Sequence, residues 1–178
     1  MKTKMTCFFA SLFLLAGCGL IKDAAEVTIS AQLSALMQVT VSEAKSAEIT
    51  AETNASDFSK SQVLYLKDNT ELEPYLDKVR EIKIKSVMVD IYGLNEGQVV
   101  NTLSLDVEGI GTIGTITDIT SMNIAYTPVI DQANLVLAGK KLKSDLKITL
   151  VVHGVANGPM SFNINMLFPV DVVAGALD

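Results

Sequence analysis

Residues 27–41 read VTISAQLSALMQVTV, and every second residue from Val27 to Val41 is apolar. Because successive side chains of a strand point to opposite faces of a sheet, this period of two predicts a strand with one buried face. The stretch is fifteen residues long, whereas most strands have about five or six. Leu36 adds an apolar residue to the polar face, so we expect the strand to bend or bulge there and to serve two sheets.

The end of the chain repeats this pattern. Residues 147–155 predict a strand, residues 157–159 (Asn-Gly-Pro) predict a turn, and every second residue of 160–174 is again apolar. Two such runs joined by a short turn predict a hairpin. Its second arm matches the stretch at 27–41 in length and character.

The segments between these arms alternate less regularly. Strands are predicted at 47–53, 63–66, 82–92, 99–107 and 122–126, with a bulge at 85–86. Polar residues 54–61 predict a loop, and the Gly- and Thr-rich segment 109–121 predicts irregular strand or loop. Helices are predicted at 70–80, where acids precede bases, and at 130–142, where Asp131 can cap the first turn.

Many short strands, separated by turn signals and joined by few helices, are typical of an antiparallel sheet that packs on itself. No strand-helix-strand rhythm predicts a parallel sheet. We therefore predict a mainly β fold, an antiparallel β-sandwich or open barrel of about eight strands with one or two short helices.

A different pattern opens the chain. Lys2 and Lys4 precede an apolar run of ten residues, 6–15. This order of positive charge and short apolar run is typical of a secretory signal peptide. Because a bilayer-spanning helix needs about 20 apolar residues, the run is too short to be a permanent anchor.

The residues that follow, Leu15-Ala16-Gly17-Cys18, resemble the lipobox of bacterial lipoproteins. By that resemblance, Cys18 receives a diacylglyceryl thioether, and signal peptidase cuts between Gly17 and Cys18. The new amino group is then acylated by a fatty acid such as palmitate. Lipid chains of this kind hold a protein at a membrane, because each buried methylene contributes about 0.8 kcal/mol.

The resemblance implies three parts of the chain: a signal peptide at 1–17, a lipidated cysteine and tether at 18–26, and a single β-sandwich domain at 27–178. It also implies a location in the cell envelope. Gly19 stands where many inner-membrane lipoproteins of Gram-negative bacteria carry Asp, which favours the outer membrane.

Charge and cysteine content limit the partners of the mature chain. The full sequence has a net charge of −6, and removal of residues 1–17, which hold two lysines and no acids, leaves −8. Nucleic acid is not an expected partner, because phosphate binding needs a basic patch. Cys7 lies in the predicted signal peptide and Cys18 is the predicted lipid carrier, so the domain has no thiol for a disulfide.

Motifs that could carry chemistry are weak. Gly109, Gly111 and Gly114 match G-x-G-x-x-G, but β-branched residues follow where a pyrophosphate site needs a helix; we expect a series of bends or bulges. His153 is the single histidine and is predicted on the polar side of its strand. We expect no catalytic residue, no cofactor and no histidine- or cysteine-based metal site, while a calcium site built from acids of distant loops stays open.

Both long strands carry aliphatic residues and methionine along a whole face, which fits a solid core or a slot for an acyl chain. The first functional hypothesis is a lipid-anchored, non-enzymatic binding or assembly module with an unknown protein partner. The alternative is a carrier or sensor of a hydrophobic ligand held between the sheets. An enzyme ranks third, and the sequence assigns no ligand-binding residue.

Overall fold

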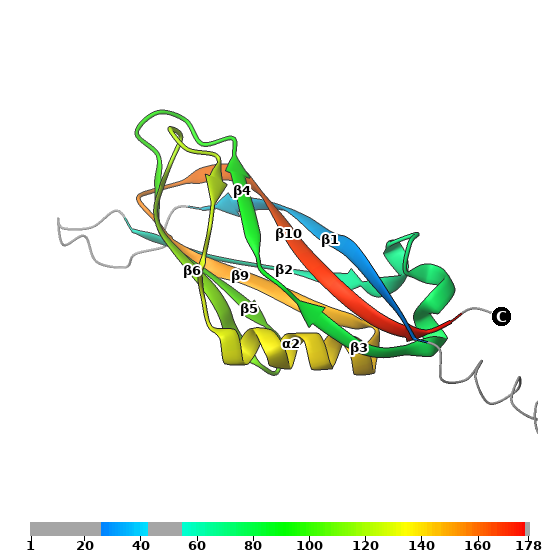
Figure 1. The fold of residues 1–178 in the computed structure, drawn as a ribbon. Coiled ribbons are helices and arrows are strands. Elements are labelled where there is room, and N and C mark those ends of the chain that lie inside the picture. Colours follow the sequence, from blue (N-terminus) through cyan, green and yellow to red (C-terminus); the bar gives the residue numbers. More distant parts are fainter. Residues whose placement is uncertain (1–25, 43–54, 177–178) are drawn as a thin grey trace, which may run out of the picture.

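The computed structural model describes residues 26–42 and 55–176, which form two facing β-sheets with an α-helix at their side (Figure 1). Every strand pairing is antiparallel. The first sheet has the order β1 (Glu26–Val41), β10 (Met160–Gly175), β4 (Met88–Tyr92) and β7 (Ala125–Tyr126), with β3 (Val79–Ile84) also paired to β10. The second has the order β2 (Ser56–Tyr65), β9 (Lys147–Ala156), β5 (Val99–Val107), β6 (Gly111–Thr120) and β8 (Val129–Ile130). The predicted antiparallel β-sandwich is confirmed.

The two arms predicted from the alternating pattern pair with each other. The register runs without a shift from Glu26 opposite Gly175 to Val41 opposite Met160. The bend or bulge expected at Leu36 is therefore wrong, and β1 belongs to one sheet only. Leu36 keeps the parity of the polar face and is 56% exposed, so it is an apolar residue on the solvent side and does not interrupt the strand.

The interior between the sheets is filled by side chains of both long strands. Every second residue of β10 from Met160 to Ala174 faces inward, and none of these is more than 6% exposed. Phe58 of β2 meets Phe162 of β10 edge to face, with ring centroids 5.5 Å apart. Protein interiors filled by side chains in this way are generally packed about as densely as organic crystals.

Several predicted segments differ from the structure, and of the strand predicted at 122–126 only Ala125–Tyr126 (β7) is formed. The polar loop predicted at 54–61 is wrong from Ser56 onward, because β2 begins there and pairs with β9 along its full length. The single bulged strand predicted at 82–92 is two strands, β3 and β4, which pair with different parts of β10. The helix predicted at 70–80 is only a short 3₁₀ helix, Glu73–Lys78, because the backbone is already extended at Val79. The strand predicted at 47–53 lies outside the described residues.

The helix predicted at 130–142 is confirmed as α2 (Gln132–Asp145). Asp131 caps it by accepting a hydrogen bond from the Asn134 N–H at 3.0 Å. The helix packs on β3 of the first sheet and also contacts β9 and β6 of the second. Gly139 permits this approach, since a Cβ atom there would lie 2.6 Å from the Ile82 carbonyl oxygen. A second 3₁₀ helix, Leu66–Asp68, follows β2.

Candidate functional site

The long strand β10 gives the molecule two distinct ends (Figure 1). Sixteen residues of strand span about 50 Å. At one end the first residue of β1, Glu26, lies opposite Gly175; we call this the terminal end. At the other end β4 stops at Tyr92, opposite Asn163 of β10, and this far end carries the connection between β6 and β7.

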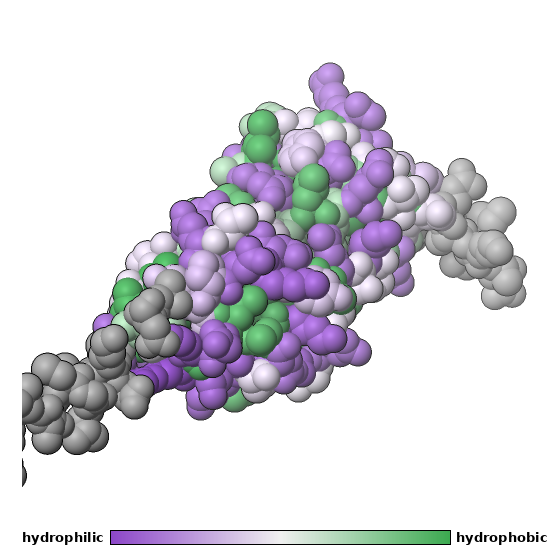
Figure 2. Space-filling view, turned by 90° about the vertical axis from the view of Figure 1, so that its right-hand side faces the viewer, coloured by the Kyte–Doolittle hydropathy of each residue, from purple (hydrophilic) through white to green (hydrophobic). Residues whose placement is uncertain are grey.

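Polar contacts hold both ends of the described chain together at the terminal end. The Arg80 guanidinium forms an ion pair with the Glu26 carboxylate, with Nη1 and Oε1 2.7 Å apart. The Lys78 ammonium donates to the Ala176 carbonyl oxygen at 2.9 Å. Seen from this side, the surface is mostly hydrophilic, with small apolar patches separated by polar residues (Figure 2).

A groove of about 600 Å³ runs between β3 and α2, in the part of the molecule where β3 pairs with the terminal half of β10. We call it the basic groove. Its walls are one face of the helix and the free side of the strand, and they comprise Arg80, Glu81, Ile82, Lys83, Ile84, Lys85, Gln132, Val136, Lys140, Lys143 and Ser144. Five of these residues are cationic and one is acidic, although the chain as a whole has a net charge of −6.

Two of the five cations have acidic partners on neighbouring strands. Besides the Arg80 pair, Lys85 forms an ion pair with Asp171 of β10, with Nζ and Oδ1 2.6 Å apart. The Lys85 ammonium and the Ser30 hydroxyl hold the pKa of the Asp171 carboxyl below its ordinary value, because both interactions favour the charged form. Lys83 adds a weaker electrostatic contribution.

The other three cations have no direct ion-pair or hydrogen-bond partner among the described side chains. Within residues 26–42 and 55–176, no hydrogen bond or ion pair joins Lys83, Lys140 or Lys143 to another side chain. Lys141, on the same helix but outside the groove, is paired with Asp145 at 2.9 Å. The basic groove therefore presents unpaired ammonium groups from both of its walls.

The floor of the basic groove is apolar. Ile82 and Ile84 are 5% and 8% exposed, and Val136 of α2 is 57% exposed. An ammonium group on a flexible stem beside such a floor suits a ligand with an anionic group and an apolar part.

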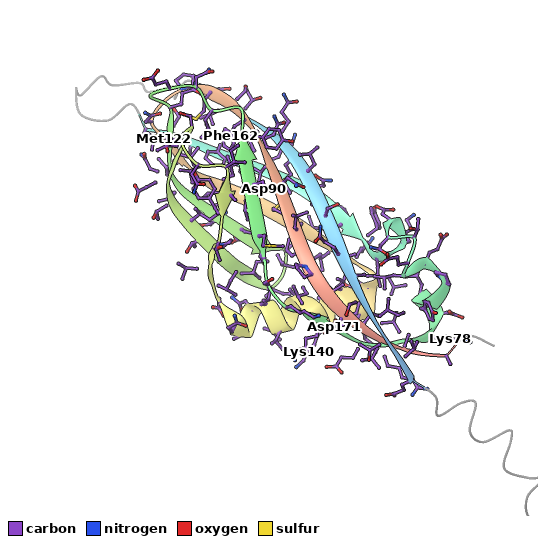
Figure 3. The ribbon with its side chains drawn as sticks, turned by 45° about the horizontal axis from the view of Figure 1, so that its top comes forward. Lys78, Asp90, Met122, Lys140, Phe162 and Asp171 are labelled. Carbon is purple, nitrogen blue, oxygen red and sulfur yellow. The ribbon has the colours of Figure 1, made fainter. Side chains whose placement is uncertain are left out.

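The far end carries exposed apolar side chains on an ordered loop. Met122 is 92% exposed and Ile124 is 58% exposed. The loop is fixed from inside, because the Tyr126 hydroxyl accepts from the Thr120 N–H at 3.2 Å and lies 3.1 Å from the Asn123 carbonyl oxygen. Figure 3 places Met122 at the end of the molecule opposite Lys78 and Lys140.

The residues singled out from the sequence do not form one site. Gly17 and Cys18 lie outside the described residues. Gly109, with φ of +80°, lies in the turn between β5 and β6, and Gly111, with φ of +107°, begins β6. The β5–β6 register shifts between Leu105, opposite Gly114, and Asp106, opposite Thr112, so the expected bend or bulge is confirmed. His153 is partly exposed on the outer face of the second sheet, with Nδ1 3.6 Å from Oδ2 of Asp106.

In the described part of the chain, the side chains are not arranged for catalysis by a histidine-activated nucleophile or for metal binding. No hydrogen bond there joins His153 to a serine, as a nucleophile and its base require. Among the same residues, no three acidic, histidine or cysteine side chains come close enough to hold a metal ion. None of the described helices is long and apolar enough to cross a membrane.

No family model matches the sequence, and no curated protein matches it significantly. Among solved structures, the chain is similar to the decameric BFDV capsid protein, with a TM-score of 0.44, 9% identity and coverage of 82% of this chain and 99% of that one. It is also similar to Desmodium yellow mottle tymovirus, with a TM-score of 0.29, 11% identity and coverage of 84% and 91%. Similarity at this level carries no argument about function.

Proposed function

We propose that this protein is a lipoprotein of the bacterial cell envelope, whose β-sandwich is a non-enzymatic binding or assembly module. One observation carries the proposal, the sequence Leu15-Ala16-Gly17-Cys18 directly after a charged start and a ten-residue apolar run. Acyl chains on Cys18 would hold the domain at the membrane, since one chain binds marginally and two or more bind stably. Gly19 favours the outer membrane.

The position of the chain start orients the domain in this proposal. Cys18 precedes Glu26 by eight residues, and an extended chain of that length spans at most about 30 Å. The terminal end of the sandwich would therefore face the lipid. The far end, about 40 Å further along β10, would point away from it.

The far end supports a role in binding a protein. Met122 and Ile124 are apolar, highly exposed and held on a hydrogen-bonded loop. A loop whose backbone is already held by hydrogen bonds loses less conformational freedom on binding, which favours association. The alternative, a hydrophobic ligand carried between the sheets, has less support, because the inward side chains of β10 are buried against the opposite sheet.

Metabolic labelling with an alkyne fatty acid tests the anchor. The wild-type protein and a Cys7→Ser variant should both be labelled, because Cys7 lies in the segment that is removed. A Cys18→Ser variant should not be labelled. Labelling that survives in Cys18→Ser, or that is lost in Cys7→Ser, would contradict the proposal.

Crosslinking in intact envelopes tests the binding module. A photoreactive amino acid at Met122 should capture a specific neighbour, either another protein or a second copy of the chain. The yield should fall at least about tenfold in an Ile124→Ser background, a loss of about 1.4 kcal/mol in binding free energy. A matched probe at Ser59, on the outer face of the second sheet, should capture nothing; equal yields from both positions would argue against a dedicated far-end contact.

A further inference from the structure

We propose that the basic groove between β3 and α2 binds the phosphate-bearing headgroup of an anionic lipid, in the leaflet that holds the protein. This inference rests on the proposed lipid anchor and adds a second, specific contact with the same membrane.

The first argument is the concentration of charge. The chain has 14 lysine and arginine residues, and five of them line this one groove. Residues 86–139, by contrast, contain six acids and no lysine or arginine. A positive site on an otherwise acidic molecule attracts a compact anion, whereas an extended polyanion such as nucleic acid would also meet the acidic surface.

The second argument is the geometry of the charges. Lys140 and Lys143 are three residues apart on α2, so they lie on the same side of the helix. Lys83 lies on β3 and Lys85 directly follows its last residue, Ile84, where the Lys85 N–H still donates to the Pro169 carbonyl oxygen of β10. The groove brings both pairs together, so that ammonium groups approach a bound phosphate from two sides.

The third argument is the apolar floor. Val136 leaves apolar surface open to solvent beside the buried Ile82 and Ile84, and the lysine stems add methylene groups. The glycerol and first methylenes of a lipid would cover this surface, while inorganic phosphate would leave it exposed. A volume of about 600 Å³ lies within the ordinary range for sites that hold small molecules.

The fourth argument is location. Arg80 lines the groove and also binds Glu26, the last residue of the predicted tether and the first described residue. A lipid on Cys18 would keep Glu26, and with it the Arg80 side of the groove, within about 30 Å of headgroups, at a high effective concentration. Figure 3 shows Lys140, Asp171 and Lys78 on the same side of the molecule, opposite Met122.

Lysine footprinting on the full lipidated protein tests this inference. The protein is reconstituted into vesicles of phosphatidylcholine alone, or with about a third of phosphatidylglycerol, and amines are acetylated briefly and quantified by mass spectrometry. We expect Lys83, Lys140 and Lys143 to react at least about threefold more slowly in the anionic vesicles. Lys141, on the same helix outside the groove, is the internal control and should change less. Raising the salt from about 0.1 M to about 1 M should remove the protection.

A pair of variants tests the groove itself. In Lys140→Gln/Lys143→Gln, protection of Lys83 by anionic vesicles should disappear, whereas Lys141→Gln should retain it. Equal acetylation of Lys83 in both vesicle types for the wild-type protein would overturn the inference. If millimolar inorganic phosphate without vesicles protected these lysines equally well, the bound anion would not need to be a lipid headgroup, and the inference would be overturned.

The intact mass of the purified protein separates the two proposals. A mass that includes acyl groups, together with an unprotected groove, would overturn the headgroup site and leave the anchor standing. A mass without acyl groups would overturn both.

Discussion

The contact between α2 and β3 depends on Gly139, and Gly139→Ala sets two effects against each other. Alanine is a better helix former than glycine by about 0.8–1.0 kcal/mol, which would stabilise α2. The added Cβ atom, however, would lie 2.6 Å from the Ile82 carbonyl oxygen, and real Cβ contacts are essentially never shorter than 3.0 Å. The obstructing atom belongs to a paired strand and cannot rotate away, so the helix must move outward by at least about 0.4 Å.

The steric effect should win. Overpacking of a close contact typically costs about 1–3 kcal/mol, so the variant should lose about 1 kcal/mol of unfolding free energy after the helix-propensity gain is subtracted. Urea unfolding followed by far-ultraviolet circular dichroism measures this value. For a domain of this size the midpoint temperature should fall by about 2–4 °C.

Val136 provides the matched control for this experiment. It lies on the same helix and is 57% exposed, so Val136→Ala and Val136→Gly differ mainly in helix propensity. Alanine should be the more stable of the two by about 1 kcal/mol. If alanine in place of glycine at position 139 stabilised the protein as much as it does at position 136, α2 could not lie as close to Ile82 as the structure shows. The geometry of the basic groove, which α2 and β3 form, would then also be wrong.

Two further predictions concern single carboxylates. Asp131→Ala should lower the unfolding free energy by about 1 kcal/mol, since it removes the cap bond to the Asn134 N–H, while Asp131→Asn should change the same urea midpoint little. The lowered pKa of Asp171 means that its contribution to stability is present above its ordinary value of 3.8 and is lost as the pH falls through the lower, folded-state value. Asp171→Asn should therefore lose less stability than the wild type between about pH 5 and pH 3, and an unchanged acid limb of the pH profile would contradict the Lys85 interaction.

The elements that local sequence predicted are those with one buried face. β1 and β10 alternate along their whole length, and β9 alternates from Lys147 to Val152, because one side of each is more deeply buried than the other. α2 was predictable from Asp131 and the spacing of its apolar residues. In each case the spacing of apolar residues in the sequence matches the face that the element buries.

The first part of β2, before the strand predicted at 63–66, was missed because it contributes few side chains to the core. Phe58 and Leu64 point inward, but the strand starts with a buried serine, Ser56, at 3% exposure and has mostly polar residues between them. Its pairing with β9 fixes its backbone, and such a partner cannot be read from the segment itself. The same holds for 70–80, where pairing with β10 draws Val79 and Arg80 into a strand.

The lysines of the basic groove stand in two short segments of the sequence, and only the fold brings these segments together. Lys83 and Lys85 lie at the end of β3 and just after it, and Lys140 and Lys143 share a helix face, but more than fifty residues separate the two pairs. Gly139 lowered the expected helix propensity of α2, yet it is the residue that lets the helix approach β3. A residue unfavourable for local structure can therefore mark a tertiary contact.

The pairing of β1 with β10 links the proposed anchor to the orientation of the groove. Because Glu26 lies opposite Gly175, both ends of the described chain leave the sandwich at the same place, and a lipid attached through either would turn the same face toward the bilayer. The lysines of the groove are then on the membrane side, and Met122 is on the opposite side. A lipid attached near Met122 would reverse this arrangement and separate the cations from the headgroups. The proposed lipobox at the start of the chain and the basic groove, whose Arg80 binds Glu26, thus favour the same orientation, although they arise from separate parts of the sequence.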